Sequence, residues 1–186
     1  MKKKTFSVFL PDTAIYYKRL KLHIRDASIK DIPLIRELTM KVWPHTYTPI
    51  LGPEQVEYMI DLFYNPSALR QQINEAGQKF IIGFDGERAI AFASYSDAGG
   101  SIFKLHKLYV LPGQQGKGAG SMMLGHIVAD VKTRRAKELH LNVNRYNYAA
   151  IAFYGKSSFT LLHDEDIDIG AGYFMNDHVL QLRIAP

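Results

Sequence analysis

The chain has 186 residues, of which 47% are apolar and 22% charged, a composition typical of a globular domain with a sizeable core. It has no cysteine, which excludes a disulfide framework, a thiolate metal site and a cysteine nucleophile, and no apolar stretch reaches membrane-spanning length. Seven Lys and Arg residues fall within residues 1–25 beside a single acid, so the rest of the chain is close to neutral and offers nucleic acid no general basic face.

Residues 1–20 start with a basic and then apolar segment that is too short for a secretion signal and is interrupted at Pro11. We therefore expect an N-terminal extension of unknown role over residues 1–20, followed by a single domain over residues 21–186.

The first predicted elements of that domain are a strand and a helix. Alternation of apolar and polar residues predicts a strand over residues 20–24. Ser28, with Asp31 at the capping-box position, predicts the start of a helix. Pro44 is predicted to end that helix, because proline interrupts the backbone hydrogen bonds of a helix interior.

The remaining elements follow from periodicity and turn signals. Asp85-Gly86 predicts a hairpin turn. Helices are expected over residues 54–64, 67–76, 121–135 and 147–156, and strands over residues 79–84, 88–96, 102–111, 138–143, 159–163 and 173–184. The acidic run Asp164, Glu165, Asp166 and Asp168 falls between the last two strands and is predicted to be a solvated loop.

A glycine-rich turn stands between a predicted strand and a predicted helix at residues 115–120, Gln-Gly-Lys-Gly-Ala-Gly. Free N–H groups and the positive end of the helix dipole bind phosphate there, and glycines let the backbone curve around the anion. A nucleotide P-loop is excluded because Gly118 stands where Ser or Thr must follow the lysine. A dinucleotide fingerprint is excluded because Ser121 stands where its third glycine belongs.

The pattern that does fit, Gln115-x-x-Gly118-x-Gly120, resembles the pyrophosphate-binding motif of the GCN5-related N-acetyltransferase (GNAT) family. A second motif, Asn147-x-x-Ala150-x-x-Phe153-Tyr154, is similar to the helix that follows the fifth strand in that family. Ser158-Phe159 stands where the family usually has Gly-Phe. The resemblance covers residues 22–184 and implies an α/β GNAT fold, with a single mixed central β-sheet of about seven strands and about four flanking helices.

The resemblance implies direct transfer of an acetyl group from acetyl-CoA to an amine, without a covalent enzyme intermediate or a metal. The strand end Leu108-Tyr109-Val110 would pair its backbone with the pantetheine arm and offer an N–H to the developing oxyanion. Asn147 would bind a pantetheine amide, cap its helix, or do both. The residues implied for the pyrophosphate are Gln115, Gly116, Lys117, Gly118, Ala119, Gly120 and Ser121. Lys117 is equally well read as a solvated loop residue.

Two side chains are candidates for proton transfer. Tyr154 occupies the family's position for the acid that protonates the CoA thiolate; the alternative is a ring packed in the core. The amine must lose a proton before it attacks, since an alkylammonium has a pKa of about 10.4. Family members often carry a Glu in the fourth strand, but residues 104–108 contain no acid. His106 is the candidate base, directly or through a water, and the alternative is a histidine on a strand face.

The acceptor is less well defined. Trp43 and Tyr47 lie in a region that resembles the first helix of Pai-type polyamine acetyltransferases, which act on spermidine and spermine, and the acidic run would attract a polycation. A peptide amine, another small amine, and a non-catalytic acetyl-CoA sensor stay open. We expect a cytoplasmic protein whose partner is a small-molecule amine or peptide, with no nucleic acid or membrane. A homodimer is also left open.

Overall fold

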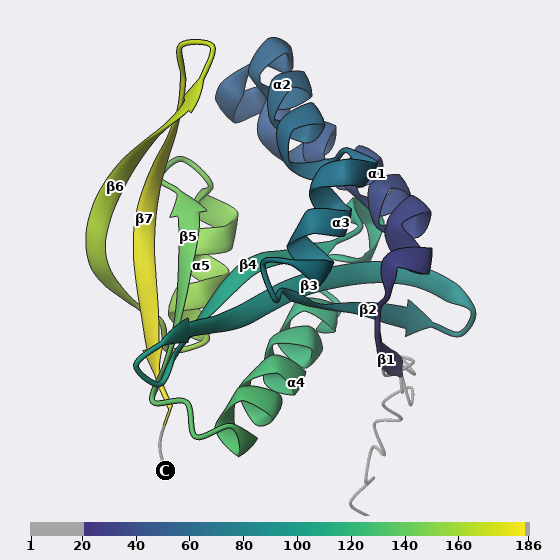
Figure 1. Cartoon of the computed structure of the whole chain (residues 1–186), viewed down its shortest axis with the longest axis vertical. Coiled ribbons are helices and arrows are strands. Elements are labelled where there is room, and N and C mark those ends of the chain that lie inside the picture. Colours follow the sequence, from purple (N-terminus) through teal and green to yellow (C-terminus); the bar gives the residue numbers. More distant parts are fainter. Residues whose placement is uncertain (1–20, 185–186) are drawn as a thin grey trace, which may run out of the picture.

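The computed structural model describes residues 21–184, and its centre is one seven-stranded mixed sheet (Figure 1). The strands lie in the order β1-β2-β3-β4-β5-β7-β6. Only β4 and β5 run parallel, and the other neighbouring pairs are antiparallel. The bounds are β1 Leu22–Asp26, β2 Lys79–Asp85, β3 Arg88–Gly99, β4 Ile102–Val110, β5 Glu138–Asn144, β6 Thr160–Gly170 and β7 Tyr173–Arg183. The extension predicted over residues 1–20 lies outside the described residues.

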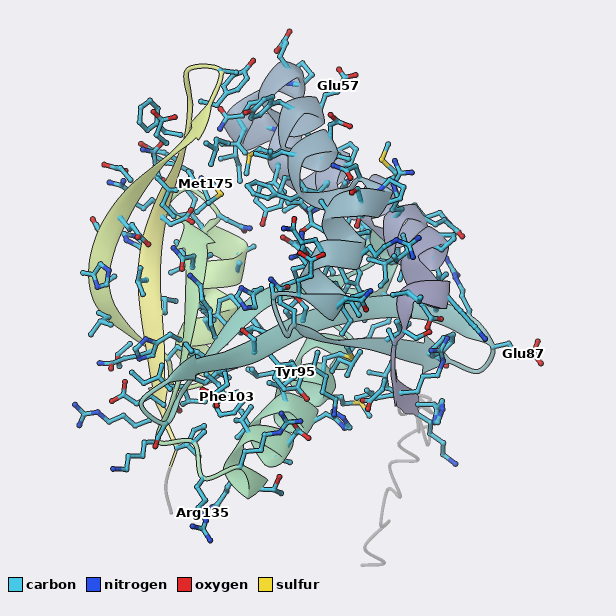
Figure 2. The ribbon with its side chains drawn as sticks, viewed as in Figure 1. Glu57, Glu87, Tyr95, Phe103, Arg135 and Met175 are labelled. Carbon is cyan, nitrogen blue, oxygen red and sulfur yellow. The ribbon has the colours of Figure 1, made fainter. Side chains whose placement is uncertain are left out.

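Within residues 21–184, five α-helices cover the sheet, with α1 to α3 on one face and α4 on the other (Figure 1). Tyr95, labelled in Figure 2, points from β3 toward α4, where its hydroxyl donates to Asp130 (2.9 Å). The predicted α/β fold, a mixed sheet flanked by helices, is confirmed. No helix in this part of the chain is long and apolar enough to cross a membrane. The bounds are α1 Ile32–Leu51, α2 Pro53–Tyr64, α3 Pro66–Asn74, α4 Ala119–Thr133 and α5 Tyr148–Lys156.

The first helix differs from its prediction at its C-terminal end. The capping box forms as expected, with the Ser28 N–H donating to the Asp31 carboxylate (2.9 Å), and it caps a short 3-10 turn that leads into α1. However, α1 continues through Pro44 to Leu51, so the prediction that Pro44 ends it is wrong. The apolar face of the helix is buried as far as Trp43, and Tyr47 and Leu51 beyond the proline pack partly buried against the same core, which outweighs the hydrogen bond lost at the proline.

The parallel strands β4 and β5 are paired over only part of their length. Their register runs from Ile102 opposite Glu138 to Leu105 opposite Leu141, and it stops there although β4 continues to Val110. On its other side β4 remains paired with β3 as far as Val110. Beyond Leu105, β4 therefore has an edge whose backbone N–H and C=O groups are not used by β5 and are available to a ligand.

A β-bulge lies at the point where β4 and β5 separate. Ser94 of β3 pairs with Lys107, but the next residue, Tyr95, pairs with Leu105, so His106 is the extra residue in β4. Because Ser94 and Ser96 lie on the same face of β3, their partners Lys107 and Lys104 share that face too. The His106 ring also contacts Ser96, through a 2.8 Å hydrogen bond between Nε2 and Oγ. The bulge thus brings two consecutive side chains of β4 to one face.

The acidic run is also placed differently from its prediction. It is part of strand β6, not a loop, and its carboxylates have partners: Asp166 binds Arg145, Asp164 binds His178 (2.6 Å), and Glu165 accepts from Asn142 (2.9 Å). The β6–β7 hairpin is long enough to reach α2 (Figure 1), where Tyr58 donates to the carbonyl of Ile169 (2.6 Å). This contact closes one side of the space between the sheet and α2.

Candidate active site

Two cavities meet where β4 and β5 separate. The larger cavity, of about 860 Å³, extends from the unpaired end of β4 along the glycine-rich loop to α5. The smaller cavity, of about 300 Å³, lies between β4, β5 and β7 on the side of α1 and α2. Figure 2 shows Met175 of β7, one of its lining residues, on the side of the strand that faces α2. The residues that line both cavities are Tyr47, Leu105, His106, Lys107, Tyr109 and Asn142.

The glycine-rich loop is built to present backbone N–H groups at the start of α4. Gly116 and Gly118 have φ of 74° and 92°, a conformation that favours glycine, and space is open where a Cβ would stand on either. Gly118 is the N-cap of α4, and no side chain caps the helix. The first N–H groups of α4 are therefore free for an anion, favoured further by the helix dipole. This loop fits a pyrophosphate.

Neighbouring residues fix the loop without occupying it. The Gln115 amide donates to the carbonyl of Val110 (3.0 Å), which ties the loop to the end of β4. A Cβ on Gly120 would lie 3.4 Å from the Phe153 ring, so a glycine there lets α4 and α5 approach closely. Five predicted pyrophosphate residues line the larger cavity: Gln115, Gly116, Gly118, Gly120 and Ser121.

Two predicted pyrophosphate residues do not line either cavity. Ala119 is buried in the first turn of α4, with 1% of its surface exposed. The Lys117 ammonium donates to the carbonyl of Gly113 (2.8 Å) and to the Gln114 side chain (3.2 Å), so its side chain is bound to the preceding turn. In this arrangement only the backbone of these two residues contributes to the loop.

The strand end predicted to hold the pantetheine arm lines the larger cavity. Leu108, Tyr109 and Val110 are half-buried there and also pack against the core. Their backbone has no β5 partner, so it is available to the pantetheine arm. Asn147 lines the same cavity, and its side chain accepts from the N–H of Ala150 (3.2 Å), so its predicted capping role is confirmed.

Tyr154 lies on α5 with its ring between those of Phe153 and Phe159, at 5.1 and 5.4 Å between centroids. It lines the larger cavity and is 8% exposed, so its ring is packed in the core at the wall of the cavity, and its role as the acid stays a prediction. Burial raises the pKa of its hydroxyl well above the ordinary value. The phenol therefore stays protonated at neutral pH and can donate a hydrogen bond to a leaving thiolate.

Aromatic rings form one wall of the smaller cavity. Trp43 contacts Tyr47, Tyr64 and Tyr109, with centroids 4.6, 5.2 and 6.1 Å apart. Continuation of α1 past Pro44 is what carries Tyr47 to this wall. The two side chains predicted to contact the substrate, Trp43 and Tyr47, are thus brought together, and Tyr47 also reaches the larger cavity.

Three basic side chains of β4 line the smaller cavity: Lys104, His106 and Lys107. Burial, and then the charges of Lys107 and Lys104, lower the pKa of His106 to about 4, so its ring is neutral at pH 7 and only a weak proton acceptor. Lys107 is 8% exposed, and burial lowers its pKa to about 8.

One carboxylate, Asp177 of β7, lines the smaller cavity. It is 6% exposed, and it stands opposite Glu165 in the register of β6 and β7. Burial, and the charge of Glu165, raise its pKa to about 6 despite a hydrogen bond from Asn142. Asn142 also donates to Glu165 (2.9 Å), so one amide holds both carboxylates.

Sequence reasoning missed Lys107 and Asp177. Strict alternation along β4 places His106 and Lys107 on opposite faces, and no sequence signal marked the bulge. Asp177 lies 70 residues further along the chain than Lys107, in a strand whose inner face could be recognised only once the β6–β7 register was known. The residues that flank it, Asn176 and His178, are polar, so no local pattern marked Asp177 as buried.

Known proteins resemble this chain in both sequence and fold. The acetyltransferase (GNAT) family matches residues 33–159, more than half of the chain. An uncharacterized N-acetyltransferase of Mycobacterium tuberculosis is 23% identical over 150 residues, which cover 81% of this chain and 96% of the relative. The PaiA N-acetyltransferase of Thermoplasma acidophilum, solved in complex with coenzyme A, has a TM-score of 0.75 at 24% identity, covering 88% of this chain and 99% of that one. The ribosomal-protein-S18-alanine N-acetyltransferase of Escherichia coli has a TM-score of 0.68 at 18% identity, covering 89% and 96%.

The sheet opens between β4 and β5 beside a glycine-rich helix start, and the family match identifies this arrangement as that of an acetyltransferase. The chain belongs to the acetyltransferase (GNAT) family, as its two motifs predicted. It is an N-acetyltransferase that uses acetyl-CoA as its cosubstrate.

Proposed function

We propose that acetyl-CoA binds in the larger cavity and transfers its acetyl group directly to a primary amine bound in the smaller cavity. The observation that carries this proposal is the junction of the two cavities at the unpaired edge of β4. A thioester whose arm pairs with that edge would face the smaller cavity. Acetyl-CoA supplies the activated acyl group, and the chain supplies position, hydrogen bonds and proton transfer.

Two side chains have proposed roles in proton transfer. Tyr154 donates to the sulfur as the thiolate leaves, since its raised pKa keeps the phenol protonated. His106 is the base predicted from sequence, and its neutral ring at the junction supports the prediction. Its low pKa of about 4 makes His106 a weak base, whether it acts directly or through a water.

A polyamine is the acceptor suggested by the resemblance to Pai-type enzymes, and the similarity to the Thermoplasma PaiA structure supports it. The charges around the smaller cavity argue against a polyamine. The acidic run in β6 binds Arg145 and His178, and the smaller cavity carries two lysines, Lys104 and Lys107, against the single carboxylate of Asp177. A polycation would meet net positive charge there. The Escherichia coli neighbour, named for the alanine of a ribosomal protein, supports an α-amine instead.

The test is thiol release from acetyl-CoA, read with a colorimetric thiol reagent. The acceptors are spermidine, amino acids, short peptides and simple alkylamines. The absence of cysteine from the chain removes background signal. We expect release with at least one primary amine. Acetyl-CoA binding without release for any acceptor would contradict the proposal and leave the alternative of a non-catalytic sensor.

A further inference from the structure

A buried lysine without a carboxylate partner lies in the smaller cavity. The Lys107 ammonium contacts the Gln78 side-chain oxygen, at 3.5 Å, and lies 5.4 and 5.5 Å from the ring centroids of Tyr64 and Phe80. Within residues 21–184 it forms no ion pair. Lys79, by contrast, binds Asp26 and Asp130 at 3.2 and 3.4 Å. A buried ammonium costs stability unless an anion compensates it.

Asp177 presents the opposite charge in the same cavity. Its carboxylate is 6% exposed and shares the Asn142 amide with Glu165, and the positive charges of Lys104 and Arg145 affect its pKa less than its burial does. It too forms no ion pair in the described part of the chain, and it does not approach Lys107 within 4 Å. Both groups carry their charge at pH 7. The pKa of Lys107, about 8, lies above this pH, so its amine is protonated, and the pKa of Asp177, about 6, lies below it, so its carboxyl is ionised.

One cavity therefore holds a buried cation on β4 and a buried anion on β7, separated from each other. A ligand with both charges would compensate both groups, while a polycation would leave Lys107 unpaired and add repulsion from Lys104. The cavity volume of about 300 Å³ is at the small end of ligand sites, which fits a small molecule.

We propose that the acceptor is a small zwitterionic amine of the amino-acid type, whose carboxylate binds Lys107 and whose ammonium binds Asp177. This inference rests on the proposed function and names its substrate class. Asp177, in place of His106, is then the catalytic base, because the carboxylate that binds the ammonium also accepts its proton.

The reaction balances with these groups. The ammonium gives one proton to Asp177, and the neutral nitrogen attacks the thioester carbonyl. The carbon–nitrogen bond forms and the carbon–sulfur bond breaks. The leaving thiolate takes the Tyr154 hydroxyl proton, and Tyr154 regains a proton that the nitrogen loses as the amide forms. Asp177 releases its proton to solvent, so one proton is produced per turnover.

The test is calorimetric binding of matched acceptors to the complex of the full chain with CoA. Each pair consists of an L-amino acid and its amide, which keeps the amine and removes the carboxylate. We expect the amino acid of the preferred pair to bind at least about 10-fold more tightly, since a buried charge pair is lost with the amide. Lys107→Met should abolish that preference, whereas Lys30→Met, at an exposed site, should leave it intact.

Asp177→Asn provides the complementary measurement, since both members of a pair carry the ammonium. It should weaken the amino acid and the amide by a similar factor. The wild-type ratio tests the proposal even if Lys107→Met does not fold. Equal binding of acid and amide throughout the panel, tighter binding of spermidine than of every amino acid, or no binding of any panel member would overturn it. A zwitterion that binds with this preference but is not acetylated would overturn the proposed function and the catalytic role of Asp177, and would leave only the recognition of both charges by Lys107 and Asp177.

Discussion

The two cavities that meet at the open edge of β4 offer a ligand different groups. The larger cavity is lined by residues of α1, β4 and β5 and by two continuous segments, residues 115–121 and 146–156, and it offers backbone N–H groups at a helix start. The smaller cavity gathers side chains from α1, α2, β4, β5 and β7, and its specific groups are buried charges. The first surface suits the phosphates of acetyl-CoA, and we expect the second to determine the choice of acceptor.

The two surfaces also differ in their effect on stability. Free N–H groups at the start of α4 remain accessible to solvent and cost little. Lys107 and Asp177 are buried with shifted pKa values, and each shift is a measure of native-state stability given up at neutral pH. Substitutions in the two cavities should therefore have different effects on stability and on activity.

The largest effect is expected at the acceptor side. Asp177→Asn should lower kcat/KM by about 1000-fold, since it removes a proton acceptor and an ammonium partner together. In the wild type, kcat/KM should fall as pH drops through about 6, because protonated Asp177 cannot accept a proton. The measurement is a pH profile of thiol release. An acidic limb near pH 4 that disappears in His106→Ala would assign the base to His106 instead.

Tyr154→Phe should separate chemistry from cosubstrate binding. We expect kcat to fall by about 100-fold, because the leaving thiolate loses its proton donor, while acetyl-CoA affinity measured by calorimetry stays nearly constant. Tyr173→Phe, which removes a hydroxyl at the tip of the β6–β7 hairpin, is the control. Equal losses in kcat and in acetyl-CoA affinity would mean that the phenol only shapes the cavity.

The stability of the fold should reveal the cost of Asp177. Its pKa is raised from 3.8 to about 6 in the folded protein, so the native state holds this proton more tightly than the unfolded state. Stability is then lost as pH rises from about 4 to about 6, by up to about 3 kcal/mol. Chemical denaturation at pH 4 and pH 7 should show that Asp177→Asn has a larger free energy of unfolding than the wild type at pH 7 but not at pH 4. If the two proteins differed in free energy of unfolding by the same amount at both pH values, this prediction would be contradicted.

A smaller effect is expected in the glycine-rich loop. Gly118→Ala places a side chain at φ of 92°, which costs about 1–2 kcal/mol, and we expect acetyl-CoA to bind about 10-fold more weakly because the first N–H groups of α4 are displaced. The control is Gly125→Ala, an exposed glycine within α4 with open space around it. That change should stabilise the helix by about 0.5–1 kcal/mol and leave binding unchanged. Similar effects of both changes on affinity would exclude a role specific to the loop.

The two cavities also differ in how much of each could be predicted from the sequence. The pyrophosphate loop and the Asn147 helix cap depend on short segments and local backbone geometry, so their residues could be named in advance. The base and the acceptor groups depend on one bulge at His106 and on the register that places Asp177 opposite Glu165. Neither follows from local propensity, because a single inserted residue or a one-residue slip moves a side chain to the other face.

Lys117 is expected to matter least, and it sharpens the contrast between backbone and side-chain recognition. Its ammonium is already bound to the carbonyl of Gly113 and to Gln114, and it does not line the larger cavity. Lys117→Met should weaken acetyl-CoA binding by less than about 3-fold, as for an exposed ion pair screened by solvent. The measurement is calorimetric affinity at low and at moderate salt. A loss of 10-fold or more that shrinks with salt would mean that Lys117 turns to the phosphate on binding, and that recognition in the larger cavity also uses a side-chain charge.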